Sequence, residues 1–408
     1  MKNDKLRFAI AGLGPRGSGM MNALLDLYDG VELVAICDPL DFRLEQAREK
    51  IKEKGLPLPT EYLSHEEMFE KENLDAVMIH TSWQSHVPVA LSAMRHGVYP
   101  GLDCGGASSV NECWELVRTS QQTGVPCMYL ENCCYGKNEL TVLRMVKMGL
   151  FGEIVHLQGG YHHDLRGEIS FGRENHHYRF DHYLNRCGEL YPAHELGPLM
   201  KCVDVNRGNR LVSLTSTASK AAGLHEYILK EKGPEYDASN FKFTQGDMIT
   251  TVIKCAHGET IVLFHDTSLP RPYSRGNLVQ GTKGIYMEDK MSVAFGHAWE
   301  DFSKYLEDKA YLHPIWHNLD EKVLSYGHDG IDYIVIGAFI DSVRNKTAPP
   351  IDVYDAATLM AITPLSEASI ACGSMPVAIP DFTDGRWLKR EAPPVTRYAL
   401  DDVYPERY

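Results

Sequence analysis

Residues 6–17 read LRFAIAGLGPRG, and this stretch decides the fold. The apolar run over residues 6–13 is typical of a strand buried in a parallel sheet. It leads into residues 12–17, which have the spacing Gly-x-Gly-x-x-Gly in front of an apolar helix pattern. The first glycine of such a turn permits a sharp bend, the second lets the backbone approach a pyrophosphate, and the third allows close helix packing. We therefore predict a Rossmann domain in which Gly12, Gly14 and Gly17 contact a dinucleotide.

An acidic residue after the second expected strand indicates which dinucleotide is bound. The strand over residues 31–36 is followed by Asp38, which lies 26 positions after Gly12. A carboxylate there suits the ribose hydroxyls of NAD and repels the 2′-phosphate of NADP. Arg43, in the same segment, is suited to a phosphate, but the aspartate favours NAD. The alternative, an ordinary glycine turn beside a surface aspartate, explains fewer of these features together.

The pattern of expected elements divides the chain in two. Strands and helices alternate up to residue 131, with strands expected at 75–80, 98–102 and 127–131 and helices at 42–54, 87–96 and 110–123. Longer, more polar strand candidates then follow at 154–161, 211–219, 248–255 and 260–266, with few helices before 331–344 and 354–372. We predict a Rossmann domain over residues 1–132 and an α+β domain over residues 133–408. The second domain would carry one large open sheet, mixed or antiparallel, with one face free.

Composition limits the classes of partner. The 408 residues are 44% hydrophobic, enough for two cores, and the formal net charge of -14 argues against nucleic acid or an anionic membrane. The ten cysteines show no C-x-x-C spacing, so we expect reduced thiols. Residues 1–5 are polar, and no apolar run reaches the ~20 residues that span a bilayer. We expect a cytoplasmic protein with a neutral small-molecule partner, and a homo-oligomer is possible through the open sheet.

Further segments carry a resemblance to a known family. Residues 81–88 (TSWQSHVP) resemble the dinucleotide-contacting loop of the Gfo/Idh/MocA oxidoreductase superfamily. Residues 131–140 (ENCCYGKNEL) and 190–198 (LYPAHELGP) resemble glycoside hydrolase family 109, the NAD-dependent α-N-acetylgalactosaminidases of that superfamily. Shorter agreements at 161–166, 177–179, 272–275, 327–333 and 364–373 extend the resemblance over nearly the whole chain.

The resemblance implies site residues in both domains. Besides the glycine turn, the NAD contacts would be Arg16, Asp38, Trp83, Gln84, His86, Asp103, Asn132 and Tyr191. The sugar would lie against Tyr161, Arg179, Tyr191, His194 and Tyr273. Tyrosine rings suit the C–H face of a sugar, and an arginine can donate to an acetamido carbonyl. We hypothesise that His194 and Tyr191 are the catalytic pair that moves protons, because an imidazole titrates near neutrality. The alternative is a packed tyrosine and a hydrogen-bonded histidine.

The resemblance also implies a reaction without net consumption of NAD. NAD would take a hydride from C3 of the sugar, a base would remove the C2 proton, and the aglycone would leave by elimination. Water would then add, and the hydride would return.

One tripeptide departs from the superfamily pattern. Its dehydrogenases carry Glu-Lys-Pro after the fifth strand and its glycosidases usually carry Glu-Val-Pro, whereas this chain has Asp103-Cys104-Gly105. Absence of the lysine favours the glycosidase over an NAD-dependent sugar or inositol dehydrogenase. The altered tripeptide also leaves open a non-catalytic sugar- or NAD-sensing homologue. The usual Tyr-Pro-Thr-His-Gly is Tyr-Pro-Ala-His-Glu here, so we expect Glu195 to place an extra charge beside the site.

Two other groups resemble metal or redox sites by composition. The first contains His162, His163, Asp164, His176, His177 and His182. No H-E-x-x-H or paired-cysteine spacing accompanies them, so we interpret the segment as a polar loop over the substrate face and expect no metal. Cys133 and Cys134 are adjacent, a spacing that forms disulfides poorly, and we interpret them as buried thiols.

Overall fold

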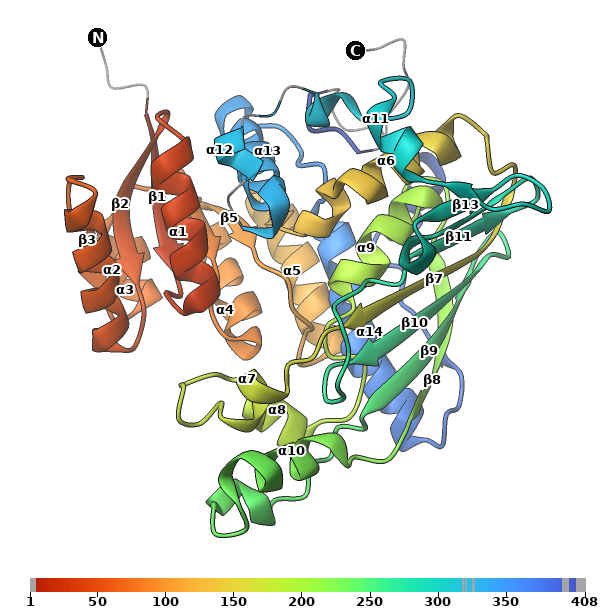
Figure 1. Ribbon diagram of the computed structural model, residues 1–408. Coiled ribbons are helices and arrows are strands. Elements are labelled where there is room, and N and C mark those ends of the chain that lie inside the picture. Colours follow the sequence, from red (N-terminus) through yellow and green to blue (C-terminus); the bar gives the residue numbers. More distant parts are fainter. Residues whose placement is uncertain (1–4, 318, 320, 325–326, 391–395, 401–408) are drawn as a thin grey trace.

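The elements form two sheets that lie side by side (Figure 1). The computed structural model describes residues 5–317, 319, 321–324, 327–390 and 396–400. One sheet has six strands in the order β3-β2-β1-β4-β5-β6, and the other has nine in the order β14-β13-β12-β11-β7-β10-β9-β8-β15. The predicted fold class, a Rossmann domain followed by an α+β domain with a large sheet, is confirmed.

The first sheet is entirely parallel and carries helices between its strands. Its central strand β1 pairs with β2 on one side and β4 on the other, so the strand order reverses there, and ligands bind at such a reversal in open α/β sheets. The strands are β1 (Leu6–Ala11), β2 (Val31–Cys37), β3 (Thr60–Tyr62), β4 (Ala76–Ile79), β5 (Tyr99–Leu102) and β6 (Met128–Tyr129). The helices are α1 (Pro15–Leu27), α2 (Asp41–Glu53), α3 (His65–Lys71), α4 (Trp83–Arg95) and α5 (Val110–Thr123).

The second sheet is mixed because β7 and β10 pair in parallel, whereas its other pairs are antiparallel. Helix α9 (Ala193–Cys202) packs on β7, and α14 (Val353–Ala371) packs on β8. Val155 and Val252 remain exposed. The strands are β7 (Ile154–His162), β8 (Leu211–Ala218), β9 (Met248–Cys255), β10 (Thr260–Asp266), β11 (Leu278–Gly281), β12 (Ile285–Met287), β13 (Ser292–Ala294), β14 (Glu300–Asp301) and β15 (Val377–Ala378).

The expectation of few helices between residues 133 and 330 is wrong. The structure has α6 (Lys137–Lys147), α7 (Arg166–Ser170), α8 (Arg179–Asn185), α10 (Gly223–Lys232), α11 (Ser303–Glu307) and α12 (Glu321–Leu324), in addition to α9. Most of them have too few turns to show a 3.6-residue period. Helix α9 also contains Gly197-Pro198, a pair that indicates a loop when only the sequence is considered.

The chain returns to the Rossmann sheet near its end. Helix α13 (Ile331–Asn345) packs beside α1, and the Phe339 ring lies 5.6 Å from that of Phe8. Helix α14 contacts both α5 and β8, so it joins the two sheets. The domain division after residue 132 stays our proposal.

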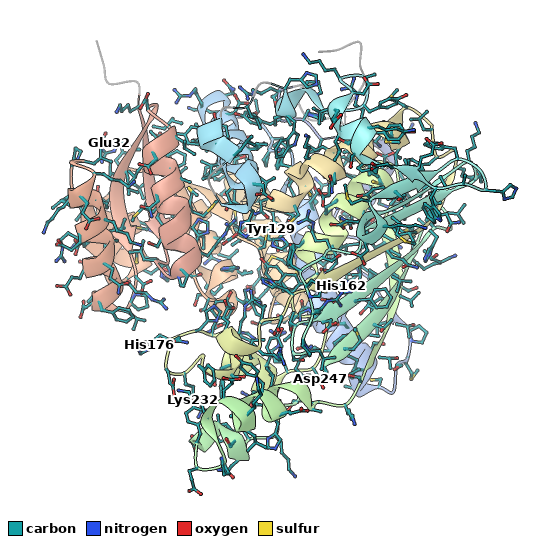
Figure 2. All side chains as sticks on the ribbon, in the orientation of Figure 1. Glu32, Tyr129, His162, His176, Lys232 and Asp247 are labelled. Carbon is teal, nitrogen blue, oxygen red and sulfur yellow. The ribbon has the colours of Figure 1, made fainter. Side chains whose placement is uncertain are left out.

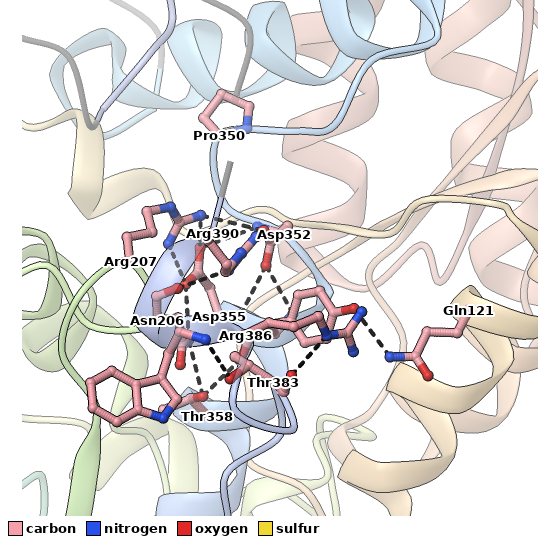
Figure 3. A network of polar contacts seen from close by, with 12 residues as sticks. Gln121, Asn206, Arg207, Pro350, Asp352, Asp355, Thr358, Thr383, Arg386 and Arg390 are labelled. Carbon is pink, nitrogen blue, oxygen red and sulfur yellow. Dashed lines mark hydrogen bonds and ion pairs between the residues drawn. The ribbon is translucent and has the colours of Figure 1, made fainter. Parts of the chain in front are cut away.

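A buried charge network fixes the start of α14 (Figure 3). Arg207 donates to both oxygens of Asp355 at 2.8 Å, while Arg390 is paired with Asp352, the residue that caps the helix. Burial opposes the charge on Asp355, but Arg207 and Lys201 hold the pKa of that carboxyl well below its usual range. The C-terminal segment is thereby attached to the second domain.

The ten cysteines are all free, as the sequence predicts. Among the described residues, no helix is both long and apolar enough to cross a bilayer.

Candidate active site

A cavity of about 510 Å³ lies at the carboxyl ends of the Rossmann strands and is closed on its far side by the second domain. Most of the predicted residues line it: Gly12, Gly14, Arg16, Asp38, Gln84, His86, Asp103, Asn132, Tyr161, Arg179, Tyr191 and His194. Three do not, namely Gly17, Trp83 and Tyr273. The structure therefore brings together most of the predicted dinucleotide and sugar residues, with Gly17, Trp83 and Tyr273 outside the lining.

The glycine turn is closed on one side and open on the other. Gly12 has a φ of +91°, and a Cβ on Gly17 would lie 1.9 Å from the carbonyl oxygen of Gly12. A Cβ on Gly14 would meet only the Arg43 guanidinium, at 3.6 Å. Gly14 therefore leaves backbone accessible from the cavity at the N-terminus of α1, the arrangement that accommodates a pyrophosphate.

Asp38 holds this turn in place. Its Oδ2 accepts a hydrogen bond of 2.8 Å from the Leu13 N–H, and its Oδ1 accepts one of 3.0 Å from the Leu40 N–H. Each carboxylate oxygen has a further lone pair for a ribose hydroxyl. Arg43 approaches Asp38 at 3.5 Å and donates to the carbonyl oxygen of His176, which lies on the α7–α8 loop facing the Rossmann domain (Figure 2).

Asp332 joins two predicted cofactor residues and was missed by the sequence analysis. Arg16 Nη1 donates to Asp332 Oδ2 at 2.7 Å, and Asn132 Nδ2 donates to Asp332 Oδ1 at 2.7 Å. Burial opposes the charge on Asp332, but Arg16 holds its pKa well below the usual range, so the carboxylate stays ionised. The matching segment 327–333 was the only signal that pointed to it.

The Arg179 side chain, which lines the cavity, lies against two aromatic rings. The Trp83 ring stacks on the Tyr191 ring at a centroid distance of 5.7 Å, and the Arg179 guanidinium lies 5.0 Å from the Trp83 ring and 5.3 Å from the Tyr191 ring. Its Nε lies 3.1 Å from Glu168 Oε1, while its buried Nη1 has no hydrogen-bond partner. A guanidinium N–H is thus available to a ligand carbonyl or hydroxyl.

Tyr191 and His194 belong to a chain of polar contacts that ends at Glu131. The Tyr191 hydroxyl lies 3.4 Å from His194 Nε2, and His194 Nδ1 lies 2.8 Å from Glu131 Oε1. Glu131 is fully buried. Burial raises its pKa, but His194, together with hydrogen bonds from the Cys104 thiol and the Cys133 N–H, holds the pKa below its usual value. Because Glu131 is a carboxylate, we assign the His194 proton to Nδ1, which leaves Nε2 as an acceptor facing Tyr191.

Glu131 is the second functional residue that sequence reasoning missed. Its side chain also accepts from the Cys133 N–H at 2.9 Å and the Cys104 thiol at 3.0 Å. Its place just after β6, the last strand of the Rossmann sheet, is a signal that could have identified it.

Glu195 does not place a negative charge beside the site, contrary to the expectation from the sequence. The side chain is fully buried, and a Cβ on Gly159 of β7 would lie 2.8 Å from the Glu195 Cβ. Burial and the neighbouring Glu189 raise the pKa of Glu195 well above its usual value, which disfavours a negative charge there. Successive residues of a helix point about 100° apart, so α9 aims His194 at the cavity and Glu195 at the sheet.

Tyr273 lies outside the cavity lining, whereas His176 and His177 of the histidine-rich segment belong to it. Tyr273 is 47% exposed, and its hydroxyl accepts a hydrogen bond of 3.2 Å from Arg275. The histidines of residues 162–182 are distributed among separate contacts, including Gln84 for His182 and Glu168 for His177. Among the described residues, the one group spaced to hold a metal ion is instead Cys104, Glu131 and His194.

Known protein families match both parts of the chain that line this cavity. The family model "Glycosyl hydrolase 109, C-terminal domain" matches residues 135–389. The chain belongs to glycosyl hydrolase family 109. The model "Oxidoreductase family, NAD-binding Rossmann fold" matches residues 6–130 of this family 109 member.

Relatives of this family 109 member match over almost their full length. It is 40% identical to a glycosyl hydrolase family 109 protein of Stenotrophomonas maltophilia, covering 99% of this chain and 94% of the relative. It is also 40% identical to an alpha-N-acetylgalactosaminidase of Tannerella forsythia, covering 95% and 88%. An oxidoreductase of Agrobacterium radiobacter, solved with NAD+, L-tartaric acid and magnesium, shares the fold at a TM-score of 0.65, 18% identity and 92% and 98% coverage.

Proposed function

We propose that this family 109 member hydrolyses α-N-acetylgalactosaminides or closely related glycosides with NAD as a recycled cofactor. The observation that carries the proposal is the Tyr191–His194–Glu131 chain, which lies in the same cavity as the glycine turn. The same cavity wall holds Arg179, whose buried Nη1 lacks a partner. His194, which can transfer a proton, and Arg179, which can donate a hydrogen bond to a carbonyl oxygen, thus face the glycine turn.

The residues present fit NAD. The open backbone at Gly14 suits the pyrophosphate, and Asp38 has lone pairs for the ribose hydroxyls. Arg16, Asp103 and Asn132 would surround the nicotinamide end. When bound, the nicotinamide supplies a hydride acceptor that becomes a hydride donor, so that oxidation and later reduction of the sugar at C3 cancel.

The remaining steps follow from the side chains of the cavity. Arg179 would donate to the acetamido carbonyl while the Tyr161 and Tyr191 rings pack on the sugar. His194 Nε2 would accept the C2 proton, directly or through the Tyr191 hydroxyl, exchange it with solvent, and donate a proton back to C2 when water has added. Glu131 would hold the imidazole in the required tautomer and stabilise its cation, because its carboxylate already accepts from Nδ1.

An assay without added cofactor tests the proposal. The purified chain should release NAD on denaturation and liberate aglycone from aryl α-N-acetylgalactosaminides, and a product formed in D2O should carry deuterium at C2. His194→Ala and Tyr191→Phe should each lower turnover by about 100-fold or more, as loss of a proton-transfer group does. His297→Ala, at an exposed loop position, is the control and should retain the parent rate.

Each other outcome of this assay has a distinct meaning. Near-normal turnover in both site variants would refute the assigned roles. Steady NADH accumulation from free sugars would indicate the dehydrogenase, for which the absent lysine is unfavourable. Silence toward glycosides and free sugars alike would indicate the sensing homologue.

The open face of the second sheet supports one further part of the proposal. The exposed Val155 and Val252 favour association of two copies through their sheets, which sedimentation of the purified chain can test. A cytoplasmic location stays a prediction.

A further inference from the structure

Three side chains of different chemistry converge at the inner end of the cavity. Cys104 follows β5, Glu131 follows β6, and His194 lies in the first turn of α9. Cys104 Sγ lies 3.0 Å from Glu131 Oε2, and His194 Nδ1 lies 2.8 Å from Glu131 Oε1. One ligand atom from each residue lies within 4.8 Å of the other two.

A thiolate, an imidazole and a carboxylate are the ligands that a borderline-soft divalent ion takes in proteins. Zinc binds them at about 2.3 Å for sulfur and about 2.0–2.2 Å for nitrogen and oxygen. Sites with three protein ligands keep a fourth position for water or a ligand. Cys104 and His194 both line the cavity, so the fourth position would face it.

The charges balance at this buried position. A divalent cation with one thiolate and one carboxylate is neutral, and a neutral group is the least costly to place in a low-dielectric interior. Binding releases one proton, which comes from the Cys104 thiol. The proton on His194 moves from Nδ1 to Nε2, so the imidazole remains neutral.

From this geometry we propose that Cys104, Glu131 and His194 bind one soft divalent metal ion of the zinc type, and that this ion inhibits the enzyme. A metal on Nδ1 places the proton on Nε2, so His194 can no longer accept one there. It also takes the Glu131 carboxylate away from the imidazole. The inhibition rests on the proposed function, whereas the binding does not.

Cobalt substitution tests the binding directly. With excess NAD present, one equivalent of Co²⁺ added to the metal-free protein should produce a thiolate-to-cobalt charge-transfer band. The band should be lost in Cys104→Ser and kept in Cys372→Ser, which removes the exposed thiol. A band that persists in Cys104→Ser would overturn the site, as would no band in the parent.

X-ray absorption of the zinc-loaded parent gives an answer that does not depend on how the variants fold. One sulfur at about 2.3 Å, with nitrogen and oxygen neighbours at about 2.0–2.2 Å, is the expected shell. No sulfur, or two or more, would overturn the proposal. Two sulfurs would mean that the adjacent Cys133 or Cys134 has captured the ion.

Inhibition is measured separately, on aryl glycoside hydrolysis. Zinc should inhibit the parent and Cys372→Ser alike, while Cys104→Ser should need at least tenfold more zinc, relative to its own metal-free rate. Binding without inhibition would overturn the inhibitory role alone. If no hydrolysis is found in metal-free protein, the proposed function fails, and the cobalt band still decides the site.

Discussion

The groups proposed to hold the dinucleotide and the guanidinium proposed to hold the sugar differ in how far they are already bonded within the protein. On the Rossmann side, Asp38 accepts from two backbone N–H groups, and Arg16 and Asn132 both bond to Asp332. On the second-domain side, Arg179 Nη1 has no partner. Groups fixed by internal bonds are preorganised for a ligand that stays, whereas a donor without a partner suits one that comes and goes. This difference is the one that the proposed function requires of a retained cofactor and a turned-over sugar.

The largest effect on ligand binding should follow from a substitution that obstructs the glycine turn of the Rossmann wall. In Gly17→Ala the new Cβ would lie 1.9 Å from the backbone carbonyl oxygen of Gly12, and its own position is fixed by the helix backbone, so neither atom can rotate away. We expect NAD affinity to fall by more than about 100-fold and the melting temperature to drop. Titration with NAD and thermal unfolding measure the two effects.

Gly19→Ala is the matched control because it lies in the same helix, with no atom within 4 Å of the new Cβ. Replacing an exposed helical glycine by alanine stabilises by about 0.5–1 kcal/mol. Equal NAD affinity in the two variants would show that the glycine turn is not the dinucleotide site.

Replacing Arg179 should impair the sugar wall and leave the Rossmann wall unaffected. Arg179→Lys keeps the charge but loses the planar group that lies over Trp83 and Tyr191, so we expect kcat/KM for an acetamido sugar to fall about 30- to 100-fold. The amount of bound NAD should not change. Arg173→Lys is the control, since Arg173 also lies over aromatic rings but is half-exposed to solvent. Loss of NAD with Arg179→Lys would contradict the division between the walls.

The two sheets and their surroundings should also respond differently to pH. Asp332 on the Rossmann side stays ionised, while burial, together with Glu139, raises the pKa of Glu288 to about 7; Glu288 accepts from the Asn277 N–H and lies outside the cavity lining. A raised carboxyl pKa means that the folded state holds the proton more tightly, so stability is lost as pH rises from the unfolded value through 7. We expect Glu288→Gln to raise the free energy of unfolding at pH 8 by about 1–2 kcal/mol.

Urea unfolding at pH 5 and pH 8 checks the direction of this change in the free energy of unfolding. At pH 5 the parent Glu288 is already protonated, so the two proteins should differ little there. The exposed Glu235→Gln should leave both values unchanged. A gain at pH 5 equal to that at pH 8 would mean that the glutamine acts through packing and not through charge.

The sequence predicts the Rossmann wall better than the sugar wall, for a physical reason. The turn over residues 12–17 and Asp38 lie close together in sequence, and their spacing is imposed by backbone geometry. Asp332 reaches Arg16 from 316 residues away, and no local pattern records that contact.

The second-domain residues could be found only through the family resemblance. Tyr161 comes from β7, Arg179 from α8 and His194 from α9, three elements that have no common spacing. Helix α9 also gives no clear periodic signal, because Gly197-Pro198 interrupts it. The direction of Glu195 depends on that helix, which is why the expected charge beside the site is absent.

The smallest effect should come from Tyr273, which tests how far the sugar wall extends. Its side chain is 47% exposed, and its hydroxyl is bonded to Arg275, whose own partner is Glu139. We expect Tyr273→Phe to change kcat/KM by no more than about threefold, because its hydroxyl lies outside the cavity lining and is bonded to Arg275 within the protein. Tyr161→Phe, at a cavity position that is 5% exposed, should cost more. A tenfold loss with Tyr273→Phe would instead show that this segment closes over the sugar, so that both walls become fixed only when substrate is bound.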